Sequence, residues 1–451
     1  MTSKQHTLIA FLLISALLSF FRIDLPGMTI VEEDFSLHWG ILSIFGTTPW
    51  TADSWGAFAD QAPYLSLGKS PFVNEPLPMW AMVGWTHITS QTLPYSRFLS
   101  SILASFALLS FYFIAKRCLK AEHAIFAPGF LAGSLMWNDI ARHASPEIWG
   151  ITLVLSSIAL LFSIMFQQQQ TWLTLIAMSV GLFLSVLILI LSSLGGIALF
   201  LLLSFIALIV VKPKLNIILA VLLSITCGCL VGLSWYWTMD FPVFSQIMAT
   251  FSIASYIPRG VHFTTLIIDF ALFPFFCSGL IIGIRRLFTT QYSPLVLFLL
   301  CWFFIAYAMF GFSAMIIPPF ALLALMGLLS TQFSIQSIRL RWILIGYALI
   351  LSAFGIAPRL VDAMNTGLFT QEWSVIGIIP LLLLIGIPLS SFFMSKDALS
   401  KLTYTTMSRA LITLVIAALI KVAFANMLGK TRIEKDKLVI LHQQEVHARI
   451  V

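Results

Sequence analysis

Three adjacent carboxylates, Glu32, Glu33 and Asp34, are the residues of this chain best suited to acid–base chemistry. They follow a hydrophobic run over 8–21, in a chain where only 10% of the residues are charged. A positioned carboxylate can take a proton from a reacting hydroxyl as a general base. The acids open a long polar segment, 24–96, and loops of this length are usually functional. A solvated acidic patch beside a membrane surface is the alternative, and these residues alone favour neither.

A second group of candidates consists of charged residues at the predicted outer ends of apolar segments. These are Asp139, Arg142, Glu147 and Asp269. Charge is costly close to a bilayer, so ionisable residues in such places are functional candidates by default. An ion pair between Arg142 and Glu147 would be purely structural, and that interpretation stays open as well.

The elements that must position these residues are predicted membrane helices. Hydrophobic residues make up 59% of the chain and its mean hydropathy is +0.99. Apolar runs of about 18–22 residues are long enough to cross ~30 Å of hydrocarbon, and helices satisfy their own backbone there. The pattern predicts an all-α polytopic membrane protein with about 13 transmembrane helices. They are expected at 8–22, 97–115, 123–140, 147–166, 172–190, 194–211, 215–235, 263–284, 294–310, 315–330, 342–357, 373–394 and 410–428.

Residues 77–93 are ambiguous, because they are apolar yet interrupted by Pro78 and His87 and flanked by Pro76 and Pro94. We interpret them as an interfacial helix with Trp80 and Trp85 at headgroup level. That choice puts the basic cluster around Lys116 and Arg117 on the inside. The positive-inside rule then predicts a cytoplasmic N-terminus, with most acids on the outer side.

These predictions define one transmembrane domain over 1–428 and a short tail over 429–451. The domain includes a first extracytoplasmic loop, 24–96, with interfacial helices, and a second large outer loop, 236–262. The net charge of +7 is explained by basic cytoplasmic loops. We therefore expect no nucleic-acid partner.

Four landmarks occur in order on the predicted outer face: 74–80 (NEPLPMW), 96–103 (SRFLSSIL), 141–147 (ARHASPE) and 256–259 (YIPR). Together with the first-loop acids, they resemble motifs of the GT-C membrane glycosyltransferases. The branch concerned contains the lipid A aminoarabinose transferases and protein O-mannosyltransferase-like enzymes. The resemblance covers about residues 1–330, and it rests on the order of the motifs and the matching topology.

The resemblance implies that a sugar passes from a polyprenyl phosphate to an acceptor hydroxyl on the extracytoplasmic face. Glu33 or Asp34 would be the catalytic base, and Glu33 aligns with the first acid of the family pair. The phosphate requires cations, and the guanidinium group suits its oxygens. Candidate donor-binding residues are Arg142, Arg259, His143 and His262, and candidate site-wall residues are Glu32, Glu75, Glu147 and Asp139. An interfacial or structural role is the alternative for both histidines.

Two departures from the family pattern keep a second hypothesis open. Glu75 stands where the family has a lysine, and the basic residue often found before the family's Pro-Pro-aromatic stretch is missing before Pro318 and Pro319. A further departure is Glu147, which stands where the family has an aspartate. The chain would then be a non-catalytic GT-C-like subunit, a structural or lipid-binding partner in a membrane complex. A transporter or flippase is a third hypothesis, disfavoured because few ionisable residues lie deep in the predicted spans.

As an enzyme, the protein is expected in the bacterial inner membrane. Its donor substrate would be a polyprenyl-phosphate-linked sugar, and we expect neither a cofactor nor a metal. Membrane lipids are expected partners, and the acceptor (a lipid, a glycan or a protein) stays open.

Overall fold

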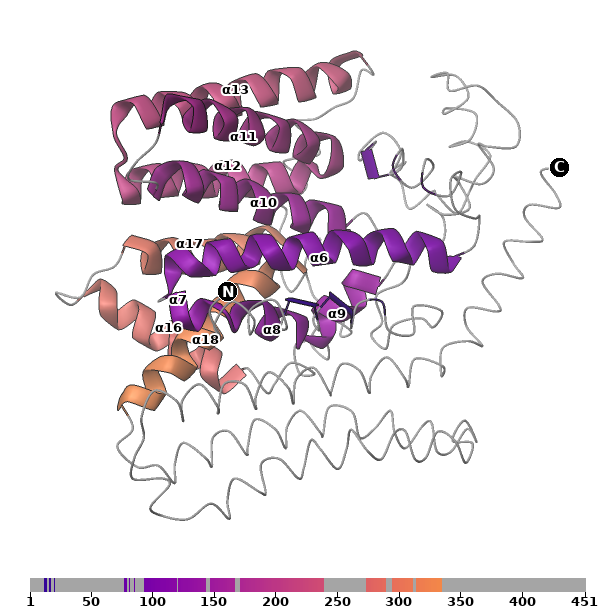
Figure 1. Cartoon of the computed structure of the whole chain (residues 1–451). Coiled ribbons are helices and arrows are strands. Elements are labelled where there is room, and N and C mark those ends of the chain that lie inside the picture. Colours follow the sequence, from indigo (N-terminus) through magenta and orange to yellow (C-terminus); the bar gives the residue numbers. More distant parts are fainter. Residues whose placement is uncertain are drawn as a thin grey trace, which may run out of the picture.

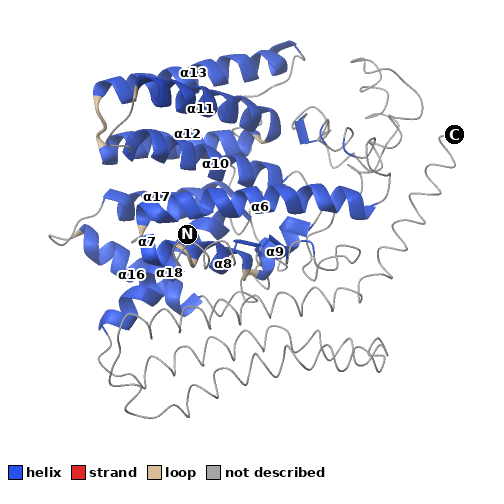
Figure 2. Cartoon of the chain, in the orientation of Figure 1, coloured by secondary structure: helices blue, strands red, loops and turns tan. Residues whose placement is uncertain are grey.

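Figure 1 shows the computed structural model of the chain as a helical bundle. The structure describes residues 12–13, 16–17, 20, 77–78, 81, 85, 93–119, 121–142, 147–166, 171–238, 273–288, 294–310 and 314–334. Within these residues every element is a helix and none is a strand (Figure 2). The helices are α6 (Leu93–Cys118), α7 (Ala121–Ala124), α8 (Ala127–Ala132), α9 (Leu135–Arg142), α10 (Glu147–Phe166), α11 (Trp172–Ser192), α12 (Leu194–Val211), α13 (Leu215–Thr238), α16 (Phe273–Leu287), α17 (Pro294–Phe310), η2 (Ala314–Ile316) and α18 (Ile317–Ser334). The all-α prediction is confirmed.

Five of the described helices, α6 and α10 to α13, are long and apolar enough to cross a membrane. The predicted spans 147–166 and 194–211 coincide with α10 and α12. Helix α12 begins at a clear sequence boundary: Ser193 separates it from α11 and accepts a hydrogen bond from the Gly196 N–H at 3.0 Å, as an N-cap does. The protein is therefore an integral membrane protein.

The predicted continuous span 123–140 is wrong in its local form. The segment folds as three short helices, α7, α8 and α9. Pro128 stands in the first turn of α8, where its missing N–H is tolerated. Gly133 and Ser134 then interrupt the helix before α9 begins. Proline and glycine in an apolar run thus outweigh its hydropathy.

The three short helices nevertheless return along the whole of α6. At one end, the Leu119 N–H donates to the Ala115 carbonyl and closes the last turn of α6. At the other, the Ser101 hydroxyl, near the start of α6, donates to the Ala141 carbonyl at 3.2 Å. The segment therefore runs antiparallel to α6, as a span would.

Side-chain contacts fix the directions of the neighbouring helices. The Thr152 hydroxyl of α10 donates to the Leu103 carbonyl of α6 at 3.2 Å. Further along both helices, Arg117 lies over the Phe166 ring, 5.9 Å from its centroid. Because both contacts preserve chain order, α6 and α10 run parallel.

Helices α11 and α13 are also parallel. Gly228 of α13 packs against Val186 of α11, and one turn later Gly232 packs against Ile190. The Tyr236 hydroxyl then donates to the Ile190 carbonyl at 2.9 Å. Glycines allow this close approach of two membrane helices.

These directions give the bundle two distinct ends. The Arg142 end, as we name it, holds the start of α6, the end of α9, the start of α10, the α11–α12 turn and η2. Here Gly150 packs so closely on Ser193 and Met315 that an added Cβ would lie 3.0 Å from a carbon of each. The opposite end, the Lys214 end, holds the end of α6 and the α12–α13 turn (Figure 1).

Helix α10 is the centre of the described bundle, with 78% of its most apolar window buried. Its adjacent hydroxyls bind two different neighbours. Ser156 hydrogen-bonds Ser110 of α6 at 3.0 Å, and Ser157 hydrogen-bonds Ser185 of α11 at 2.7 Å. Such interhelical hydrogen bonds hold membrane helices in register.

Other predictions fall wholly or mostly outside the described residues. These are the span 8–22, the interfacial helix 77–93, the loops 24–96 and 236–262, the spans 342–357, 373–394 and 410–428, and the tail 429–451. Of the predicted span 263–284, the structure describes α16, which begins at Phe273. The predicted 315–330 span starts as η2 and continues as α18, with Pro318 and Pro319 in its first turn.

Candidate phosphate site at the Arg142 end

Helix α9 presents Arg142 to the interior of the bundle. The Ser134 hydroxyl accepts a hydrogen bond from the Trp137 N–H at 3.3 Å, which caps the helix, and Trp137 is itself buried. Asn138 and Arg142 lie one turn apart and therefore on one face. They are 2% and 1% exposed, respectively. The cap and the buried tryptophan fix the direction in which this polar face points.

Helix α6 contributes a second buried polar face at the same end. Arg97, Ser100 and Ser101 share one side of its first turns and are each at most 2% exposed. The hydrogen bond from Ser101 to the Ala141 carbonyl joins this face to the residue next to Arg142. Two arginines from different helices are thereby enclosed at one end of the bundle.

An enclosed guanidinium is always charged and requires polar partners. Both Arg97 and Arg142 make interactions within the structure. The Ser100 hydroxyl, one turn from Arg97, is buried without a hydrogen bond. Two guanidinium groups and a hydroxyl, buried at the same end of the bundle, are donors of the kind that suits phosphate oxygens. The chemistry available here is the binding of an anion and the stabilisation of negative charge.

Glu147 lies at the same end but in a different environment. It occupies the first turn of α10 and is exposed, whereas Arg142 is enclosed. An acid in the first turn also complements the helix dipole, so this residue has a structural role available to it. Asp139 lies on α9, within one turn of Arg142.

The other predicted site residues lie outside the described part of the chain. They are Glu32, Glu33, Asp34, Glu75, His143, Arg259, His262 and Asp269. The structure thus places Arg142 and Glu147 at one end of the bundle, with the backbone of Asp139, and leaves the rest of the predicted set as predictions.

Arg97, Ser100 and Asn138 are the residues that sequence reasoning missed. Arg97 belongs to the 96–103 landmark, where we used it only to recognise the motif. A charged residue at the start of an apolar run was the available signal. Ser100 and Asn138 gave none, because their burial depends on helix packing.

No family model matches the chain, and no curated protein matches it in sequence. Solved structures do match. ArnT from Cupriavidus metallidurans bound to undecaprenyl phosphate aligns with 95% of this chain and 77% of its own, at 15% identity and a TM-score of 0.59. The same protein in the apo state gives a TM-score of 0.57. The apo oligosaccharyltransferase of Archaeoglobus fulgidus aligns over 78% of this chain and 55% of its own, at 13% identity and a TM-score of 0.51.

Both neighbours are GT-C fold glycosyltransferases. This protein accordingly has an all-helical membrane fold of the GT-C, ArnT-like type. The fold implied by the motif resemblance is confirmed.

Proposed function

We propose that the protein is an integral membrane glycosyltransferase that moves a sugar from a polyprenyl-phosphate donor to an acceptor hydroxyl. The reaction would take place on the extracytoplasmic face of a bacterial inner membrane, with the N-terminus in the cytoplasm. The main support is the GT-C fold, which aligns with 95% of the chain and whose solved neighbour holds undecaprenyl phosphate. The enclosed arginines at the Arg142 end add a donor set of suitable chemistry.

In this proposal Arg142 and Arg97 hold the donor phosphate, with Arg259 as a further candidate and His143 and His262 as secondary ones. Glu33, or its neighbour Asp34, takes the proton from the acceptor hydroxyl. The hydroxyl oxygen then bonds to the anomeric carbon, and the bond from that carbon to the phosphate oxygen breaks. The leaving phosphate gains negative charge, which the guanidinium groups stabilise.

A second candidate function is a non-catalytic, lipid-binding or structural subunit. Its specific support is the near-complete burial of Arg97 and Arg142, because a purely structural pair would be enclosed in the same way. A subunit of this kind would bind polyprenyl phosphate, or a protein partner, without turnover.

The test uses purified full-length protein, labelled polyprenyl-phosphate sugars and membrane extract as the source of acceptor. Transfer of label supports the enzyme, and the Arg142→Lys variant should then bind donor more weakly. The control is Arg285→Gln. Arg285 is exposed in the last turn of α16, which lies at the Lys214 end (Figure 1), so its loss should leave binding unchanged.

Donor binding without transfer, together with a stable complex after gentle detergent extraction, would establish the second candidate. If the protein neither binds nor turns over any of the donors, the glycosyltransferase proposal is wrong.

A further inference from the structure

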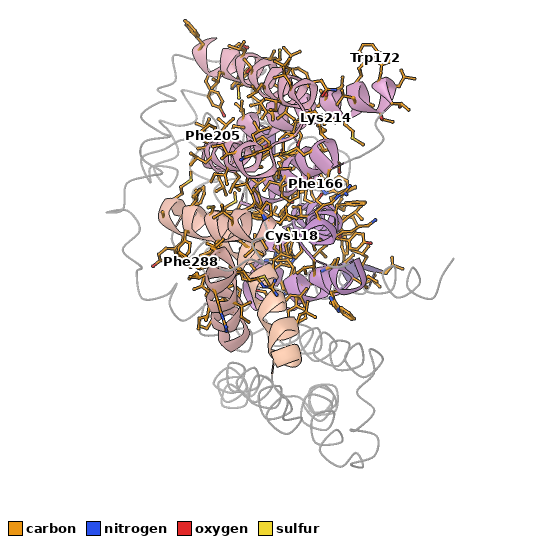
Figure 3. All side chains as sticks on the ribbon, turned by 90° about the vertical axis from the view of Figure 1, so that its left-hand side faces the viewer. Cys118, Phe166, Trp172, Phe205, Lys214 and Phe288 are labelled. Carbon is orange, nitrogen blue, oxygen red and sulfur yellow. The ribbon has the colours of Figure 1, made fainter. Side chains whose placement is uncertain are left out.

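The Lys214 end has an unusual corner where α11 and α13 begin. Figure 3 looks onto this end of the bundle and labels Trp172 and Lys214 at that corner. Trp172 and Leu173 are each 73% exposed, and Leu215 is 70% exposed. Lys212 and Lys214 are exposed on the turn that leads into α13. We call these five residues the Trp172 corner.

Helices α11, α12 and α13 carry no acidic residue that could offset the two lysines of this corner. Between Glu147 and Asp240 the sequence has no other charged residue than Lys212 and Lys214. Helix α6, which packs on the other side of the bundle against α10, brings Lys116 and Arg117 to the same end, and the following helix α7 carries one acid, Glu122. The described surface here is therefore positive and matches an anionic partner.

The position of the Trp172 corner relative to the hydrocarbon layer indicates a lipid headgroup as its partner. Helix α12 has 18 residues, which at 1.5 Å per residue gives a length of about 27 Å. This is close to the ~30 Å thickness of the hydrocarbon layer. Lys212 and Lys214 follow directly after α12 and so lie at headgroup level. Exposed tryptophan is favoured at this same level.

The backbone conformation of the α12–α13 turn is a second, independent reason to expect a function for its lysines. Lys212 is in the left-handed conformation, with φ 50° and ψ 59°, and no other non-glycine residue of the described chain has a positive φ. Its N–H caps α12 by donating to the Leu208 carbonyl at 3.1 Å. Glycine or asparagine adopts this conformation at less cost than lysine. A lysine here, followed by a proline that fixes the chain, suggests that the charge itself is used.

We propose that the Trp172 corner is a binding surface for anionic phospholipid headgroups. The two lysine ammonium groups would bind headgroup phosphates, while Trp172, Leu173 and Leu215 pack on the adjoining chain region. The surface lies at the end of the bundle opposite Arg142, so it is distinct from the proposed donor site. A basic residue close to an anionic membrane surface contributes about five-fold to binding, so the pair should give about 25-fold.

The experiment uses full-length protein in nanodiscs of equal phosphatidylglycerol and phosphatidylcholine. In one preparation the phosphatidylglycerol carries bromines at shallow chain positions, and in the other the phosphatidylcholine does. Bromines quench tryptophan fluorescence at close range. The chain has 13 tryptophans, so the Trp172 signal is obtained by subtracting a Trp172→Phe variant in each background.

We expect Trp172 to be quenched several-fold more by brominated phosphatidylglycerol. The double variant Lys212→Asn/Lys214→Gln should remove this preference, and asparagine keeps the left-handed turn favourable. The matched control, Arg285→Gln/Arg286→Gln, removes two charges from the same end on a different helix and should keep the preference.

Equal quenching by both lipids in the unaltered protein would overturn the proposal. So would a preference that persists in the lysine variant or disappears in the arginine control. If the double variant does not reconstitute, the Lys212→Asn single variant decides: it should lose part of the quenching preference, and an unchanged preference would overturn the proposal.

Discussion

The cationic side chains are buried at one end of the bundle and exposed at the other. At the Arg142 end, Arg97 and Arg142 are 2% and 1% exposed and lie between packed helices. At the Lys214 end, Lys212 and Lys214 are exposed beside protruding apolar side chains. Burying a charge costs free energy unless polar partners bind it in a fixed geometry. The planar guanidinium is well suited to binding such partners. Exposed ammonium groups suit a diffuse, hydrated surface. This difference fits the two proposals above, a specific anion site at the Arg142 end and a lipid-binding surface at the Lys214 end.

The largest expected effect concerns the acids predicted to act at the Arg142 end. Glu33→Gln or Asp34→Asn should lower the transfer rate by about 10²–10⁴-fold, because a positioned base is lost. Glu32→Gln should keep most activity, since neighbouring residues of an extended or helical chain point in different directions. Transfer of label by the purified variants is the measurement. Full activity in all three, and in the triple variant, would remove catalysis from this acidic stretch.

Next in size is the stability difference between the ends. Arg142→Ala should lower the free energy of unfolding by at least about 2 kcal/mol, because enclosed partners lose their charged group. Arg285→Ala at the Lys214 end should change it by less than about 0.5 kcal/mol, as surface substitutions do. Thermal unfolding in detergent compares the two variants. Equal effects would mean that the ends do not differ as described.

A smaller effect is expected from the hydrogen bond that closes α13 onto α11. Tyr236→Phe removes the bond to the Ile190 carbonyl and should cost about 1 kcal/mol. Ser234→Ala removes an exposed hydroxyl that bonds only within its own helix, to the Val231 carbonyl. That control should be nearly neutral. If the two variants have the same free energy of unfolding, the Tyr236 hydrogen bond does not stabilise the Arg142 end.

The smallest expected change lies at the Lys214 end and has the opposite sign. Lys212→Asn should leave stability unchanged or raise it by a few tenths of a kcal/mol, because asparagine tolerates the left-handed conformation better. Chemical unfolding of the detergent-solubilised protein measures it. Marked destabilisation would show that the lysine side chain supports the fold.

The sequence predicted the helical class and several span boundaries, because long apolar runs bounded by polar turns leave few alternatives. It failed where local and global signals conflict. Residues 123–140 have the hydropathy of a span, yet Pro128 and Gly133 divide them. Ser134 had no recognisable pattern as a cap. The burial of Arg97 and Arg142 at the same end of the bundle could not be predicted, because it depends on α9 packing on α6.

The site residues show the same limit. Arg142 was predicted from its place beside an apolar segment, which is a one-dimensional signal. The burial of Ser100 and Asn138 is a property of the assembled helices, and neither residue type suggests a site by itself. The sequence therefore indicated which charged residues lie in unusual places beside apolar segments. The packed helices showed which of them are buried at the same end of the bundle.

The most direct test of the central claim is a cryo-EM structure of the protein with a polyprenyl phosphate. We expect the phosphate at the Arg142 end, with its oxygens within hydrogen-bond distance of the Arg142 and Arg97 guanidinium groups. The lipid chain should leave the bundle between helices toward the membrane. A phosphate bound elsewhere, with both arginines still enclosed by protein groups alone, would contradict it.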